Sequence, residues 1–281
     1  MDHRVYTIRK DNWRDSLEQL LNAAGLPERI RSSPLVIVKP NLVESLPPPV
    51  TTPVGLVDAL IGYLKEKSPS SRIIVAEGTG AIDYDTFHCF ESLGYTRMAA
   101  VRRVELIDLN AAPLLKKNNP DCGRWPELFL PAILDAAFLL SVPVLKVHSL
   151  AGVTLTMKNM MGCVPPSHYR RGNSWGKSAF HSGIDAAIFD LNRYRSPDFT
   201  LLDATVGMVQ NHLWGRHCQP PVGKLACGWD PVAIDSYGAL LLGKKWQDVG
   251  HIRLAHLILG NAEPVDPVDC ELSAAVCRDG C

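Results

Sequence analysis

Five side chains that can hold an anion or move a proton lie within fourteen positions of the chain. They are two lysines, a histidine, a threonine and an asparagine: Lys146, His148, Thr154, Lys158 and Asn159. Ammonium, imidazole, hydroxyl and amide groups suit an anionic small molecule, because each donates hydrogen bonds to carboxylate or phosphate oxygens. A solvated helix face with a core histidine would explain each residue alone, but the whole set favours a functional site.

Two of these residues are candidates for chemistry as well as binding. A lysine that is partly buried among other cations has a lowered pKa, so Lys158 is the candidate base or nucleophile. His148 is the candidate general acid or base, because an imidazole titrates near neutral pH without help. Glu77 or Asp203 could orient this imidazole or take a proton. His181 precedes a predicted helix, where it either contacts the ligand or packs at the helix start.

The set follows an apolar segment that has the length of one buried strand. Residues 138–145 predict this strand, small residues at 149–152 predict a turn, and residues 154–161 predict a helix that a glycine ends. Thr154 and Lys158 would then share one face of the helix. Polar groups at the carboxyl end of a buried strand, before a helix, mark the usual ligand position in an open α/β sheet.

Two other predicted strands also end in polar residues. Residues 34–39 form an apolar strand that ends in Lys39 and is followed by Asn41, and residues 72–76 run into Glu77. Because parallel strands bring their carboxyl ends to one edge of a sheet, we expect these groups to join the lysines of the first set. Together they would clamp a carboxylate or a phosphate.

Strands that alternate with helices predict an α/β protein with a mainly parallel sheet and helices on both faces, of Rossmann-like type. We expect one domain over residues 1–260 and an irregular, cysteine-containing tail over 261–281. Residues 110–125 are expected to be irregular, and residues 165–177 to be a lid or disordered. The other expected helices are 13–24, 53–64, 85–93, 130–137, 182–191, 230–242 and 249–259. Thr52, Ser182 and Asp230 are the predicted amino-terminal caps of the helices that begin at 53, 182 and 230. The other expected strands are 104–109, 199–204 and 224–227.

The composition limits which classes of protein this chain can belong to. The 281 residues carry 29 basic and 29 acidic side chains, and this balance disfavours a nucleic-acid surface, which usually needs a basic excess. No signal-peptide pattern and no apolar run of membrane-spanning length occur, so we expect a cytoplasmic protein. None of the eight cysteines forms a CxxC pair, and free thiols are therefore expected. The sequence predicts no particular cofactor and leaves a homo-oligomer open.

Other interpretations of the same residues remain open. The pocket could bind an anion or nucleotide without turnover. A metal site could use His148, His181 and a carboxylate, or His212, His217 and Cys218, although adjacent side chains rarely bind one metal well. Asp230 and Asp235 are expected to be structural. Cys163 is expected to fill space in the core rather than to act as a nucleophile.

The chain resembles the DUF362 family, which is named for its lack of an assigned function. The likeness covers residues 34–260 and depends on motifs that are weak singly and specific together: Lys39-Pro40-Asn41, Thr51-Thr52-Pro53, residues 142–148, residues 153–159 and residues 228–235. Many members carry a ferredoxin-like CxxCxxCxxxCP run, which does not occur here, so the resemblance does not imply that cluster for this chain. Cys270, Cys277 and Cys281 are either free thiols or a remnant metal or iron–sulfur site.

A fainter resemblance is to the amino-terminal domain of the lactate-racemase family. His148 and Lys158 lie ten positions apart across a turn of small residues. In that family a histidine and a lysine so placed serve a nickel-pincer nucleotide, which the lysine holds covalently. Its Gly-Thr-His motif appears here as Gly78-Thr79-Gly80, without the histidine. The resemblance implies a similar fold and a pocket at the same strand ends.

Overall fold

The computed structural model describes residues 2–174, 176–263 and 266–271. In this part of the chain one large sheet has the strand order β12-β1-β11-β10-β7-β2-β3-β4. The strands on this path are β1 (Val5–Arg9), β2 (Leu35–Pro40), β3 (Arg72–Glu77), β4 (Glu105–Asp108), β7 (Phe138–Val142), β10 (Phe199–Met208), β11 (Lys224–Gly228) and β12 (Val268–Asp269). The pairs from β10 through β7, β2 and β3 to β4 are parallel, and β11 is antiparallel to both β10 and β1. The predicted α/β fold with a mainly parallel sheet is therefore confirmed.

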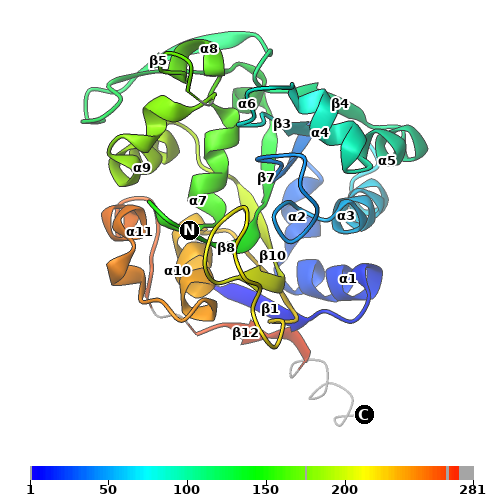
Figure 1. Cartoon of the computed structure of the whole chain (residues 1–281). Coiled ribbons are helices and arrows are strands. Elements are labelled where there is room, and N and C mark those ends of the chain that lie inside the picture. Colours follow the sequence, from blue (N-terminus) through cyan, green and yellow to red (C-terminus); the bar gives the residue numbers. More distant parts are fainter. Residues whose placement is uncertain (1, 175, 264–265, 272–281) are drawn as a thin grey trace, which may run out of the picture.

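Helices cover both faces of this sheet (Figure 1). Alternate residues of β2 belong to different apolar clusters, since Ile37 packs in one and Val36 and Val38 pack in the other. The face of Val36 is covered by α1 (Trp13–Ala23), α2 (Leu26–Ile30), α3 (Val54–Lys67), α4 (Thr86–Ser92) and α5 (Tyr95–Arg102). The face of Ile37 is covered by α7 (Thr156–Asn159), α9 (Ile184–Tyr194), α10 (Pro231–Leu241) and α11 (Gly250–Ala255). Both faces of the central strands are thus buried, as their apolar sequences require.

The predicted single strand over residues 138–145 is wrong. Proline has no N–H to give to the ladder, and Pro143 separates β7 from a second strand, β8 (Val144–His148). The strand β8 pairs with β10 and forms a hairpin with β9 (Gly152–Thr154). The predicted helix over 154–161 is correspondingly shorter, because Thr154 belongs to β9 and α7 is followed by the 3-10 helix η1 (Met160–Cys163).

Several peripheral elements also differ from the prediction. Residues 110–125 are not wholly irregular, since β5 (Leu114–Asn118) forms a separate hairpin with β6 (Glu127–Pro131). The expected helix over 130–137 is only α6 (Ile133–Ala136), because β6 occupies its start. The described part of the tail is not wholly irregular, because β12 pairs with β1. Cys277 and Cys281 lie outside the described residues.

Two of the three predicted helix caps are wrong. Gly183, with a φ of 64°, precedes α9 in place of a Ser182 side-chain cap. The hydroxyl of Thr52 does not cap α3. It donates to the carbonyl of Val142 (2.7 Å) and accepts from the N–H of Asn41 (2.8 Å), and so links the ends of β7 and β2. Asp230 does cap α10, because its carboxylate accepts from the second and third N–H groups of the helix. No described helix has the length and apolar character to cross a membrane.

Candidate functional site

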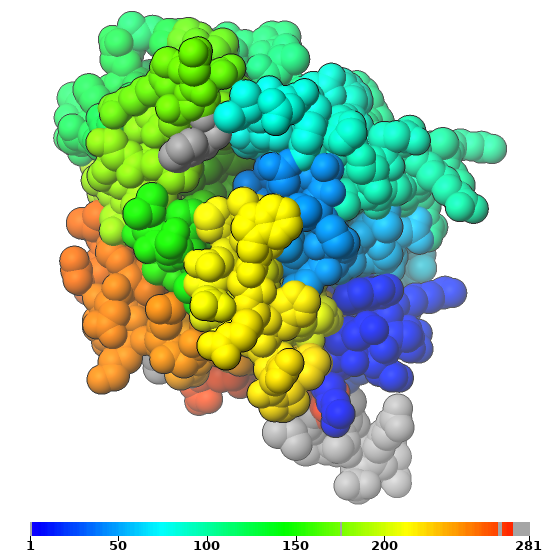
Figure 2. All heavy atoms as spheres, viewed as in Figure 1, coloured from blue at the N-terminus to red at the C-terminus, as the bar shows by residue number. Residues whose placement is uncertain are grey.

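A cavity of about 450 Å³ lies where the carboxyl ends of β2 and β3 meet the β8–β9 hairpin and α7. Figure 2 shows this face of the molecule, on which the yellow segment that holds residues 209–216 lies between the green segment after β8 and the blue segment after β2. Eight of the nine predicted site residues line the cavity: Asn41, Glu77, Lys146, His148, Thr154, Lys158, Asn159 and His181. The ninth, Lys39, is fully buried and bonds directly to two of these eight.

A hydrogen-bond network of five buried side chains forms the floor of the cavity. The Lys39 ammonium lies 2.5 Å from a carboxylate oxygen of Glu77 and 3.2 Å from the amide oxygen of Asn159. Asn41 donates to this same oxygen (2.9 Å) and accepts from the Lys146 ammonium (2.9 Å). Burial raises the pKa of Glu77, and the ammonium groups of Lys39 and Lys177 oppose this rise. The network therefore fixes β2, β3, β8 and α7 to one another.

Lys158 differs from the lysines of the floor because its ammonium is free. Among the residues that the structure describes, it has no hydrogen-bond or ion-pair partner. Burial lowers its pKa to about 8. After burial, the charge of Lys158 is the next cause that lowers the pKa values of Lys146, His148 and His212. The charge of Lys158 thus acts on three other titratable groups of the cleft.

Lys177 is a site residue that the sequence did not predict. It lies in the segment 165–177, whose described part contains α8 (Pro166–Tyr169), and its ammonium donates to the carbonyl oxygens of Gly78 (2.6 Å) and Gly162 (2.9 Å). Burial lowers its pKa to about 8. A Cβ at Gly78 would lie 2.4 Å from the Gly162 carbonyl oxygen, so only glycine allows these two backbones to meet. A single lysine in a polar segment carries no periodic signal that would have identified it.

The His148 imidazole is neutral, and its proton lies on Nε2. Its Nδ1 accepts from the backbone N–H groups of Leu150 and Ala151, each at 3.1 Å, so this nitrogen carries no proton. Burial lowers the pKa of His148 far below its usual value. The ring stacks on that of His212, with the ring centroids 4.2 Å apart. His148 is therefore placed to donate a hydrogen bond from Nε2 and not to shuttle protons through Nδ1.

The expectation that a carboxylate orients this imidazole is wrong. Backbone N–H groups hold Nδ1, while Glu77 bonds to Lys39. Asp203 lies inside β10 and accepts from the hydroxyl (2.6 Å) and the N–H of Thr205. Its side chain therefore stabilises the strand and is not among the residues that line the cavity.

Two further polar atoms of the cavity residues have no partner within the described part of the chain. They are the hydroxyl oxygen of Thr154 and Nδ1 of His212. Thr154 is only 3% exposed, and a buried hydroxyl without a hydrogen bond costs roughly 1–3 kcal/mol. Together with the Lys158 ammonium, these atoms would find partners in a polar ligand.

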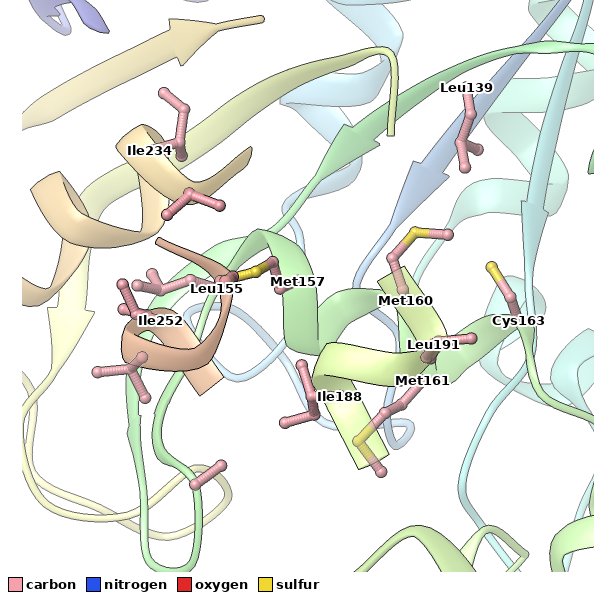
Figure 3. Close-up of a cluster of buried hydrophobic side chains, with 14 of the residues drawn as sticks. Leu139, Leu155, Met157, Met160, Met161, Cys163, Ile188, Leu191, Ile234 and Ile252 are labelled. Atoms are coloured by element: carbon pink, nitrogen blue, oxygen red, sulfur yellow. The ribbon is translucent and has the colours of Figure 1, made fainter. Parts of the chain in front are cut away.

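The short helix α7 holds Lys158 and Asn159 at the cavity because groups from elsewhere anchor it. The buried carboxylate of Asp235, on α10, accepts from the N–H groups of Thr156 (2.7 Å) and Met157 (3.0 Å). In Figure 3 the labelled side chains of Met157 and Met160 lie in the apolar cluster with Ile188 and Leu191 of α9. A helix of four residues is unstable alone, so these contacts position its polar side.

Replacing Asp235 with alanine should lower the free energy of unfolding by about 2–3 kcal/mol, because two buried N–H groups lose their acceptor. Anion binding should weaken too, since Lys158 is on the same helix. Urea unfolding measures the first effect. Asp235→Asn keeps one acceptor oxygen and should lose less stability than alanine. Equal losses for the two variants would contradict the capping role.

Neither a metal site nor a reactive Cys163 is supported by the described residues. Among the described residues, no group of three or more His, Cys, Asp or Glu side chains is placed to hold a metal ion. Cys163 is buried, and burial raises the pKa of its thiol to about 11, which suits a core residue. Cys270 is buried as a free thiol.

The comparisons with known proteins agree with both expected resemblances. The model of a domain of unknown function, DUF362, matches residues 36–240. No curated protein matches the chain. Among solved structures, the lactate racemase apoprotein from Thermoanaerobacterium thermosaccharolyticum superposes with a TM-score of 0.55 at 12% identity. The match covers 89% of this chain and 59% of that one, so the chain spans well under two thirds of the racemase, and at this identity the likeness shows the fold alone.

Proposed function

The chain belongs to the DUF362 family, whose function is unknown, and from the chemistry of its cleft we propose that it is an enzyme that binds a small carboxylate or phosphate at the strand ends. The observation that carries this proposal is the free Lys158 ammonium, which lines the same preformed cavity as the unpartnered hydroxyl of Thr154. Buried polar groups in proteins are almost always hydrogen-bonded. Polar groups that have no partner in the described chain, and that can donate to an anion, therefore indicate where a ligand would bind.

The proposed chemistry divides between two residues. Protonated Lys158 binds the anion, and its neutral form, which a pKa of about 8 makes accessible, can accept a proton or attack a carbonyl carbon. His148 remains neutral and donates from Nε2, which would polarise a ligand oxygen as negative charge develops there. The floor network around Lys39 supplies the rigid base for both residues.

A binding protein without turnover is the second candidate. The hydrogen bond between the Lys146 ammonium and Asn41 in the floor favours this candidate. Side chains whose polar atoms are already bonded to one another can hold a ligand in place but do not react with it. The Lys158 substitution described in the Discussion separates the two candidates.

The affinity for a small anion should fall by about tenfold per pH unit above pH 8 for each lysine that must be protonated to bind it. Lys158 and Lys177 both have a pKa of about 8, and raising the pH removes the protons that attract the anion. Below pH 7 both are charged, so the affinity should be constant there. Calorimetric titration with acetate from pH 6 to 10 measures this profile. An affinity that rises with pH would mean that the neutral amines bind the ligand, and would contradict the proposal.

Thermal-shift measurements with sodium acetate and sodium phosphate, against sodium chloride at equal ionic strength, test the proposal directly. An anion at 100 times its dissociation constant should stabilise the protein by about 2.7 kcal/mol. Lys158→Met should reduce this shift, and Lys245→Met, at an exposed lysine outside the cavity, should keep it. If neither anion stabilises the wild-type protein, the proposed function fails.

A further inference from the structure

The cavity is much larger than the anion that its polar groups would hold. Sites of roughly 300–1,000 Å³ bury ligands of drug size, and this one measures about 450 Å³. Acetate or phosphate would occupy only a small part of that space. The remaining space must face another part of the ligand, so the residues that line it indicate the chemistry of this part.

Two leucines of the lining are much more exposed than its most deeply buried polar residues. Lys146, His148 and Thr154 are almost completely buried. By contrast, Leu150 is 60% exposed and Leu213 is half-buried, and both line the same cavity. Exposure increases toward the mouth, so these leucines border the opening above the polar floor. Exposed leucines at a polar cleft are in place to cover an apolar group.

The charge of the cavity suits an anion of low charge. The Lys39 ammonium pairs with Glu77, so the three lysines of the lining, Lys146, Lys158 and Lys177, face one unpaired carboxylate, that of Glu44. No arginine is among the described residues that line the cavity, so the bidentate contact that favours phosphate groups is missing. A polyphosphate or nucleotide would place several negative charges beside two carboxylates, at a cost that this lining does not offset.

We propose that the ligand is a monocarboxylate with an apolar body of several carbon atoms. Its carboxylate lies on the floor against Lys158 and Thr154, and its body packs against Leu150 and Leu213 at the mouth. This inference rests on the proposed anion site and narrows it to one class of ligand. The cavity volume, the exposed leucines at the mouth and the lack of arginine in the described lining support it.

A series of straight-chain carboxylates at pH 7, from acetate through butyrate and hexanoate to octanoate, tests the proposal by calorimetry. Each methylene that packs against the leucines should tighten binding by about two- to fourfold, the upper value corresponding to complete burial. Octanoate should then bind at least fiftyfold more tightly than acetate, and also more tightly than inorganic phosphate. Octanol, which has the body without the charge, should bind more weakly than octanoate.

Variants locate the effect within the cavity. Leu150→Ser and Leu213→Ser should each reduce the gain per methylene and leave the affinity for acetate within about twofold. Leu115→Ser is the matched control, because Leu115 is a similarly exposed leucine in β5 outside the cavity. Octanoate affinity equal to that of acetate, or unchanged by the cavity variants, would overturn the inference while the anion site stands. If no anion binds at all, both proposals fail.

Discussion

Replacing Lys158 with methionine should weaken the binding of a small anion by about 10- to 100-fold, because a charge-assisted hydrogen bond contributes roughly 1.5–3 kcal/mol. The same change should leave the free energy of unfolding unchanged or slightly higher. The Lys158 ammonium has no partner in the described chain, and burial opposes its charge, so the folded protein loses no bond with it. Calorimetry and urea unfolding measure the two effects.

The opposite directions of these two effects distinguish a functional lysine from a structural one. Lys245→Met is the control for a lost surface charge and should change neither quantity. If Lys158→Met unfolds more easily and binds the anion as before, Lys158 is structural and the proposed role is wrong. Once a reaction is found, turnover that disappears in this folded variant would identify an enzyme, and retained turnover would show that Lys158 does not perform the chemistry.

Lys39→Met should produce the largest loss of stability, about 3–5 kcal/mol, because it leaves the buried carboxylate of Glu77 without its ammonium partner. For a chain of this size, such a loss lowers Tm by roughly 10 °C. Anion binding should fail as well, since the Lys39 ammonium also bonds to Asn159 in the floor. Thermal and urea unfolding check the prediction.

The double variant Lys39→Met with Glu77→Gln should recover part of this stability, because it removes the unpaired charge. The exposed pair of Arg72 and Glu105 is the control, and Glu105→Gln should cost less than about 1 kcal/mol. If the double variant is as unstable as the sum of the two single variants, the two side chains do not act as a pair.

The central strands and their polar ends could be predicted from the sequence because local patterns determine them. The expected strands at 34–39 and 72–76 agree with β2 and β3 within one residue, and Asp85 and Asp230 were assigned correctly to helix starts. Apolar runs of strand length bounded by turn residues, and aspartates before helices, are signals within a few positions. The gathering of the site residues followed from the parallel arrangement of these strands.

The remaining features depend on contacts that no local pattern contains. Periodicity cannot tell one long strand from two short ones, so the break at Pro143 and the β8–β9 hairpin were missed. The helix α7 forms because Asp235, 79 positions away from Thr156, supplies its cap. The edge strand β12 is defined by its pairing with β1, which itself pairs with β11.

The floor network has a consequence for how the cleft arises. Lys39 and Asn159 are 120 positions apart in the chain, and Asn41 and Lys146 are 105 apart, so no short fragment of the protein contains both halves of the cleft. Contacts between such distant segments form late and slowly in folding. A molecule that occupies the cleft therefore binds only the completed fold and would protect newly made protein from degradation. The amount of this protein in a cell should accordingly rise when its ligand is abundant.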